Sequence, residues 1–231
     1  MVFLFILEFS NRQMAIINHL NRIPAIKVLA ANGPYAVIDL SAANPALTQV
    51  KNVEQYQKYI DDFLRKNSAT VAYGGYNERR SLYDDAELFN DGDSEPRNIH
   101  LGTDLWAKAG TEVLAALSGT VHSFAFNAGK GNYGPTIILE HKIEGERFFT
   151  LYGHLSLEDI GELEIGERFE SGAVIGKLGT AFENGGYAPH LHFQLILDIG
   201  DYFGDYPGVC SESDAEFYVN NCPDPNLMLK L

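Results

Sequence analysis

The chain has 231 residues, 45% of them hydrophobic and 21% charged, which is the composition of an ordinary soluble globular protein. This length allows one large or two small domains. Its 31 acidic residues outnumber the 17 basic ones and give a formal net charge of −14. That balance argues against nucleic acid as a partner, because phosphates require Lys and Arg, and against docking on anionic lipid.

The N-terminus begins with an apolar run from Met1 to Leu7 that ends at Glu8. The run lacks the basic region and the small-residue cleavage site of a secretory signal, and it is too short to cross a bilayer. Met14 is an alternative start. We therefore expect no signal peptide and no membrane span, and we favour a cytoplasmic location over a periplasmic or secreted one.

The first ninety residues have the pattern of a small α+β unit. Apolar runs at 25–30 and 35–41 surround an Asn-Gly-Pro turn and predict a β-hairpin. Apolar residues at spacings of three, four and seven predict an amphipathic helix within 50–66. The acidic segment 84–96 is expected to be a surface loop. We predict an N-terminal extension over 1–90 that packs on a second domain over 91–231, with a C-terminal tail from about 199.

From residue 97 onward the pattern is that of β structure. Short apolar runs separated by glycine-bearing turns predict strands at 111–126, 136–142, 147–152, 174–178 and 190–197. Residues 144–146 are expected to join two of these strands in a hairpin. The prediction is a mainly β, antiparallel fold of two packed sheets.

His190 and His192 lie on one of these predicted strands, in the sequence Pro-His-Leu-His-Phe. Residues i and i+2 of a strand point to the same face, so the two imidazoles are expected side by side. Two such rings form a poor apolar core, because each has nitrogens that need partners, but a good site for a divalent metal. Two structural histidines with satisfied hydrogen bonds are the alternative.

Two further segments strengthen the metal interpretation. His100 and Asp104 place an imidazole and a carboxylate four residues apart, and a catalytic zinc site uses three protein ligands and leaves one position open. His100, Asp104 and one of His190 and His192 would supply those three, which leaves the other histidine for proton transfer. His154 follows another apolar strand in the sequence Leu-Tyr-Gly-His-Leu-Ser.

These motifs, in this order, resemble the lysostaphin-type zinc endopeptidases, metallopeptidase family 23. The connecting segments 107–121 and 166–179 resemble that family as well, and the resemblance covers roughly residues 97–198. It implies a two-sheet metallopeptidase domain of the duplicated hybrid motif type and one zinc ion per chain. By the same resemblance His100, Asp104 and His192 are the zinc ligands, and His154 and His190 are catalytic.

The resemblance also has departures. Gln194 stands where many relatives carry an acid two residues after the second histidine of the pair. The tail around 222–226 and the flanks at 37–41 and 73–80 are most similar to the version of this domain fused to class III aminotransferases and aminoglycoside-kinase-like domains. That similarity leaves the physiological substrate open.

The chemistry of these residues suits amide hydrolysis without a covalent intermediate. Zinc held by two imidazoles and a carboxylate is a Lewis acid with an open position, and nearby imidazoles can transfer protons. We expect an endopeptidase that acts on peptidoglycan stem or cross-bridge peptides. The alternative is a non-catalytic zinc-binding or regulatory module with the same fold. The scissile bond, the division of roles between His154 and His190, and the oligomeric state are left open.

The remaining candidates receive simpler interpretations. His141 closes a predicted strand and is expected to be exposed. Arg97 either steadies the groove, holds a substrate carboxylate or is an ordinary surface residue, and Tyr133 and the segment 184–187 are expected to shape the groove. Cys210 and Cys222 form either one disulfide or two free thiols.

Overall fold

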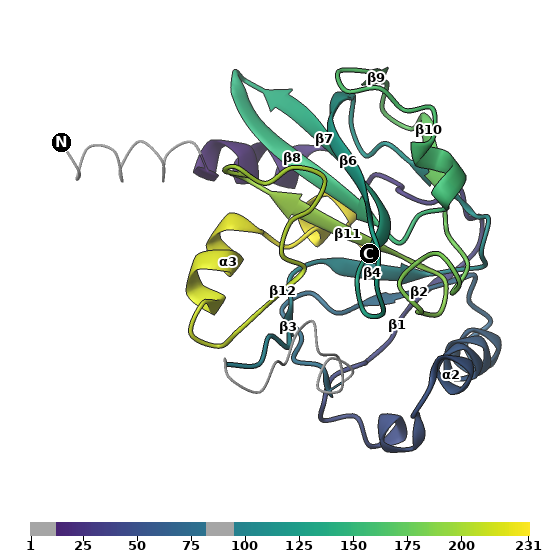
Figure 1. Ribbon diagram of the computed structural model, residues 1–231. Coiled ribbons are helices and arrows are strands. Elements are labelled where there is room, and N and C mark those ends of the chain that lie inside the picture. Colours follow the sequence, from purple (N-terminus) through teal and green to yellow (C-terminus); the bar gives the residue numbers. More distant parts are fainter. Residues whose placement is uncertain (1–12, 82–94) are drawn as a thin grey trace.

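The computed structural model describes residues 13–81 and 95–231. Its centre is a sheet of eight strands in the order β1-β2-β4-β11-β8-β7-β6-β9 (Figure 1). The strands of this sheet are β1 (Tyr35–Val37), β2 (Val71–Gly74), β4 (Thr103–Trp106), β6 (Gly119–Asn127), β7 (Gly134–Ile143), β8 (Glu146–Gly153), β9 (Arg168–Phe169) and β11 (His190–Ile196). The predicted N-terminal run 1–7 and most of the predicted loop 84–96 lie outside the described residues.

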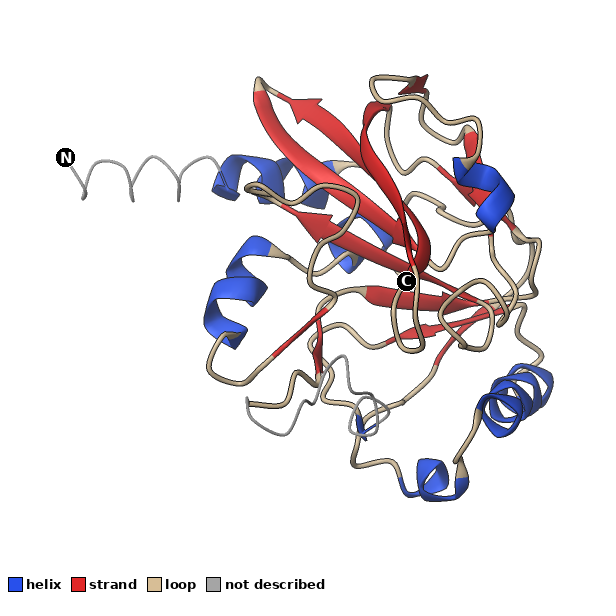
Figure 2. Ribbon diagram, viewed as in Figure 1, coloured by secondary structure: helices blue, strands red, loops and turns tan. Residues whose placement is uncertain are grey.

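Two small sheets and several helices surround the large sheet (Figure 2). The small sheets pair β5 (Glu112–Leu114) with β10 (Val174–Lys177) and β3 (Ile99–His100) with β12 (Val209–Cys210). The helices are one over residues 13–22, α2 (Val53–Lys66), α3 (Ala215–Asn221) and α4 (Asn226–Leu229), with short 3-10 turns η1 (Pro45–Gln49) and η3 (Leu157–Ile160). Within the described parts of the chain, no helix is long and apolar enough to cross a membrane.

The predicted mainly β, antiparallel fold class is confirmed. Every strand pair of the large sheet is antiparallel except β1–β2. The predicted hairpin is formed by β7 and β8, whose last pair joins Ile143 to Glu146. Glu144 and Gly145 both have positive φ, 53° and 90°, as a two-residue turn that matches the strand twist requires.

The predicted amphipathic helix is α2. The side chain of Asn52 caps it by accepting a hydrogen bond from the backbone N–H of Gln55, and Arg65 and Lys66 occupy its last turn, where the helix dipole favours cations. Tyr56 and Ile60 are buried and pack in a cluster with Trp106 of β4. The helix therefore belongs to the same apolar cluster as Trp106, which lies on the strand that carries Asp104.

The predicted hairpin between residues 25–30 and 35–41 is wrong. Ala30 N donates to Glu112 O, and Leu114 N donates to Val28 O, so the first run pairs with β5. The second run begins β1, which lies parallel to β2. Because parallel neighbours need a crossover, the chain leaves β1, passes through α2 and returns as β2.

The β1–α2–β2 unit continues the same sheet as the later strands, since β2 pairs with β4 in the register Gly74 to Asp104. Two apolar clusters cover much of the sheet. The larger contains Leu20 of the N-terminal helix together with Leu191 and Phe193, and the second contains Leu151, Ile196 and both cysteines. The division into domains at residue 90 stays a prediction.

His141 is buried, not exposed as the sequence suggested. It is 1% exposed because β7 lies inside the sheet, between β6 and β8. Its Nε2 lies 2.7 Å from Thr150 Oγ1, and its Nδ1 lies 3.1 Å from Ser118 O. Burial lowers the pKa of this imidazole to about 4, although the Ser118 carbonyl opposes the shift.

That burial predicts a pH dependence of stability. A histidine has a pKa near 6.5 when unfolded, so the unfolded chain binds the proton first as pH falls. The stabilising effect of neutral His141 is therefore complete above about pH 6.5. Up to about 3 kcal/mol of the free energy of unfolding is lost as pH falls toward 4. His141→Gln should flatten the free energy of unfolding across this window in denaturant titrations. Equal pH slopes for the variant and the natural chain would contradict the prediction.

Candidate metal centre

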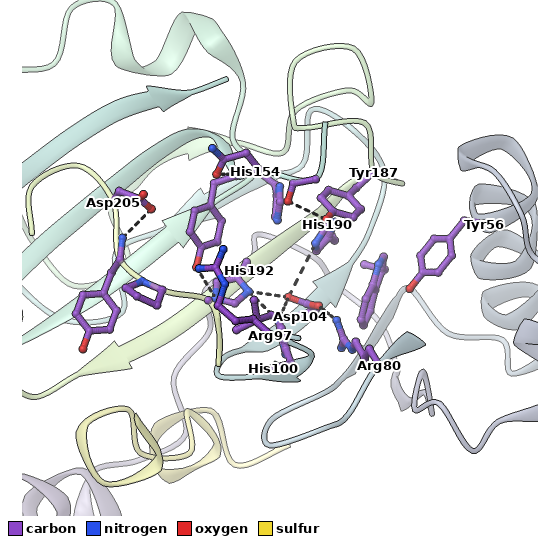
Figure 3. Close-up of a pocket in the computed structure, with 18 of the residues that line it drawn as sticks. Tyr56, Arg80, Arg97, His100, Asp104, His154, Tyr187, His190, His192 and Asp205 are labelled. Carbon is purple, nitrogen blue, oxygen red and sulfur yellow. Dashed lines mark hydrogen bonds and ion pairs between the residues drawn. The ribbon is translucent and has the colours of Figure 1, made fainter. Parts of the chain in front are cut away.

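The histidines and Asp104 meet because two strands pair in one register. In the antiparallel pair β4–β11, His192 lies opposite Asp104 and His190 lies opposite Trp106. Side chains of residues two apart share a face, so all four point the same way. On its other edge, β11 places His192 opposite Gly153, and His154 follows directly. These three strands therefore bring Asp104, His154, His190 and His192 to one place, and β3 adds His100 (Figure 3).

Three donor atoms converge there. His100 Nε2 and His192 Nδ1 are 2.9 Å apart, and each is 3.2 Å from Asp104 Oδ1. All three residues are buried. Tetrahedral zinc with bonds of about 2.0–2.1 Å holds its donors about 3.3 Å apart. The donor set therefore fits zinc in both chemistry and spacing.

The outer nitrogens of both imidazoles are occupied by hydrogen bonds. His100 Nδ1 lies 2.8 Å from the carbonyl oxygen of Gly75, and His192 Nε2 lies 2.8 Å from Gln194 Oε1. Each acceptor requires the N–H form at that nitrogen, which leaves the lone pair of the other nitrogen directed at the shared space. Gln194, the departure noted in the sequence, thus orients His192 as an acid would.

Arg80 balances the negative charge of Asp104 by binding the carboxylate oxygen that does not face His100 and His192. Its Oδ2 accepts a hydrogen bond from Arg80 Nη1 at 2.5 Å, and both side chains are 2% exposed. Burial by itself raises the pKa of Asp104, but His100 and Arg80 together hold it well below the usual range. The carboxyl is therefore ionised, as a metal ligand must be.

Two further imidazoles stand beside the donor set. The ring centroids of His154 and His190 are 4.2 Å apart, and His190 Nε2 lies 3.9 Å from Asp104 Oδ1. His154 Nδ1 donates to Asn184 O, and His190 Nδ1 donates to Ala188 O, each at 2.8 Å. Both rings therefore present Nε2 as the nitrogen free to exchange a proton.

The backbone at His154 is held in an unusual conformation. Its φ is +66°, in the left-handed region that few residues other than glycine adopt. Its N–H donates to Tyr133 O, and its C=O accepts from Gly179 N, both at 2.9 Å. The surrounding loops thus fix a strained residue at the site, a combination typical of functional positions.

Burial keeps these imidazoles neutral. It lowers the pKa of His100 to about 4, that of His154 well below the ordinary value, and that of His190 in the same direction. Neutral rings have the lone pairs needed to bind a metal or accept a proton.

A pocket of about 230 Å³ opens above the donor set. Tyr133 and Tyr187, expected at the groove, line it, and so does Arg97. The sequence interpretation missed other lining residues, namely Tyr56, Arg80, Trp106, Tyr202, Asp205 and Tyr206. Trp106 lies two residues after Asp104 on the same strand, so strand alternation could have predicted it at the pocket. The other residues come from distant segments, and no local sequence pattern marks them.

The two cysteines are free thiols in the structure, and both are buried. Cys222 Sγ accepts a hydrogen bond from Gln194 Nε2 at 3.3 Å. Burial raises the pKa of Cys222 to about 12 and that of Cys210 to about 11, so both stay protonated.

Gly102 is packed directly against the donor set. A β-carbon there would lie 2.7 Å from His192 Cε1 and 2.8 Å from the backbone oxygen of Phe193. We expect Gly102→Ala to displace the His192 ring and weaken zinc binding at least tenfold, measured by chelator competition. Gly161→Ala is the control for glycine loss, because its φ of −71° suits alanine and its β-carbon would meet only the backbone oxygen of Glu158, at 3.4 Å. Equal zinc affinity in the two variants would contradict the packing argument.

A buried His–Asp–His donor set with two neutral imidazoles beside it could hold a divalent metal and transfer protons next to it. Residues 98–201 match the model of peptidase family M23. The chain is also 33% identical over 99 residues to the peptidoglycan DD-endopeptidase ShyC of Vibrio cholerae. Together these matches show that part of the chain is similar to the M23 peptidases. The aligned region is 43% of this chain and only 20% of that relative.

Solved structures resemble the chain more weakly. The catalytic domain of lysostaphin from Staphylococcus simulans is 20% identical with a TM-score of 0.41, and the match covers 70% of this chain and 96% of that one. A zinc-containing peptidase from Vibrio cholerae is 22% identical with a TM-score of 0.37, and the match covers 53% and 31% of the two chains.

Proposed function

We propose that this protein is a zinc-dependent endopeptidase that hydrolyses peptide bonds in peptidoglycan stem or cross-bridge peptides. The observation that carries the proposal is the convergence of His100 Nε2, Asp104 Oδ1 and His192 Nδ1 in a buried, correctly spaced donor set. The family match over residues 98–201 supports the same reaction class.

In this proposal His100, Asp104 and His192 hold one zinc ion. When bound, zinc supplies Lewis acidity toward a water molecule and a peptide carbonyl. The protein fixes the donors through Gly75 O and Gln194 Oε1, so that neither imidazole needs to reorient. Burial of the three residues excludes bulk water from the donor side and leaves the pocket side open to substrate.

His154 and His190 are the proposed proton-transfer groups. Each is neutral, anchored through Nδ1, and presents Nε2 beside the donor set. One imidazole accepts the proton of the attacking water, and the other stabilises the developing oxyanion or donates a proton to the leaving amine. Trp106 stacks on His190 at 5.5 Å and holds that ring in place.

The proposed substrate class rests on the ShyC relative, whose name specifies a peptidoglycan DD-endopeptidase. The pocket has aromatic walls from Tyr133, Tyr187 and Tyr206 and charged groups from Arg97 and Asp205. Such a surface suits a short peptide with ionised ends, because a substrate carboxylate can pair with a guanidinium. The fusion to an aminotransferase remains a prediction.

The test combines metal content with a substrate assay on the purified, untagged chain. We expect about one zinc per chain by elemental mass spectrometry, and cleavage of defined muropeptides detected as new amine ends by mass spectrometry. A chelator should stop the cleavage, and added zinc should restore it. Bound zinc without turnover on any muropeptide would favour the non-catalytic module, and failure to bind zinc would reject both functions.

A further inference from the structure

Arg80 is a buried cation that the hydrolytic chemistry does not use. Its side chain is 2% exposed, whereas that of the preceding Arg79 is 52% exposed and pairs with Glu212 at the surface. Arg80 also lies outside the segment that matches the family model, which begins at residue 98. A fully buried guanidinium is costly unless it is paired, so its partners indicate what it does.

Those partners connect the N-terminal part of the chain to the donor set. Arg80 Nε donates to Glu78 Oε2 at 2.7 Å, and Arg80 Nη1 donates to Asp104 Oδ2 at 2.5 Å. Glu78 is itself fixed, since its Oε1 accepts from the backbone N–H of Leu40. The rigid guanidinium fork thus spans two carboxylates, one anchored on the backbone and one in the donor set.

The two oxygens of Asp104 therefore have different surroundings. Oδ1 faces His100 Nε2 and His192 Nδ1 at 3.2 Å each, while Oδ2 is held by Arg80 (Figure 3). A carboxylate without such a partner can rotate and offer both oxygens to a metal. Arg80 also lies over the ring of Trp106, 5.6 Å from its centroid, and Trp106 stacks on His190.

We propose that Arg80 is a positioning residue. Its hydrogen bond occupies Oδ2 of Asp104, so that only Oδ1 is available to bind the metal. The donor set then contributes three atoms and leaves the remaining coordination position for water and substrate. Through Trp106, the same guanidinium supports the wall against which His190 is held. This inference rests on the proposed zinc site, and it gives part of the N-terminal extension a direct role there.

The test uses the full chain with Arg80→Met, which removes the guanidinium, and Arg80→Lys, which keeps the charge but replaces the rigid planar fork with a single ammonium group. Arg79→Met is the matched control at the exposed neighbour. Zinc affinity is measured by chelator competition, and Co²⁺ is substituted for zinc to read the coordination number from its visible absorption. Circular dichroism establishes which variants fold.

We expect Arg80→Met to raise the Kd for zinc about 10- to 100-fold and to weaken the Co²⁺ absorption, because a second oxygen of Asp104 joins the coordination. Arg80→Lys should show a smaller change in both readouts, and Arg79→Met should match the natural chain. An unchanged Kd and cobalt spectrum in either folded Arg80 variant would overturn the inference. If the natural chain binds neither metal, the proposed function fails first, and the two failures are thereby distinguished.

Discussion

Replacing His192 with alanine is expected to remove zinc binding and peptide hydrolysis together. His192 Nδ1 lies within 3.2 Å of both other donor atoms, so its loss leaves two ligands where a zinc site needs three or four. Zinc content should fall from about one per chain to near zero after dialysis, measured by elemental mass spectrometry. Hydrolysis of a muropeptide cleaved by the natural chain should become undetectable.

The matched control is His122→Ala. His122 lies on β6, and its Nδ1 contacts Ser123 Oγ, away from the donor set. This variant removes an imidazole without touching the pocket above the donors, so it should keep both zinc and turnover. Full zinc occupancy in His192→Ala, with the affinity of the natural chain, would reject the ligand assignment.

Removing the proton-transfer histidines should separate metal binding from catalysis. We expect His190→Ala and a His154 variant to retain zinc and to lower kcat about 10²- to 10⁴-fold. The reason is that neither imidazole belongs to the three-atom donor set, while His190 Nε2 lies 3.9 Å from Asp104 Oδ1 and the ring centroid of His154 lies 6.4 Å from that of His192. The measurements are zinc stoichiometry and turnover on the same preparation.

The choice of variant matters at His154, because its φ is +66°. Asparagine tolerates the left-handed region better than alanine does, so His154→Asn removes the imidazole with less backbone strain. If the two histidines act in one step, the double variant should lose little more activity than the worse single variant. Turnover within twofold of the natural chain in either single variant would show that the named histidine is not a proton-transfer group.

The sequence by itself determined the features that depend on local geometry. Strand alternation placed His190 and His192 on one face, helical spacing predicted α2, and the turn residues Glu144 and Gly145 predicted the β7–β8 hairpin. These are short-range effects, since backbone sterics and a period of two or 3.6 residues act within a few positions. The five candidate site residues came from such patterns together with the family resemblance.

Only the tertiary structure decided which segments meet. The register that sets Asp104 opposite His192, the parallel pairing of β1 with β2 and the burial of His141 all depend on long-range packing. Strand partners are chosen by the packing of whole faces, and a local apolar run does not encode its partner. The contact between Arg80 and Asp104 could not be predicted for the same reason. The two residues are 24 positions apart in the chain, and no local sequence pattern marks their contact.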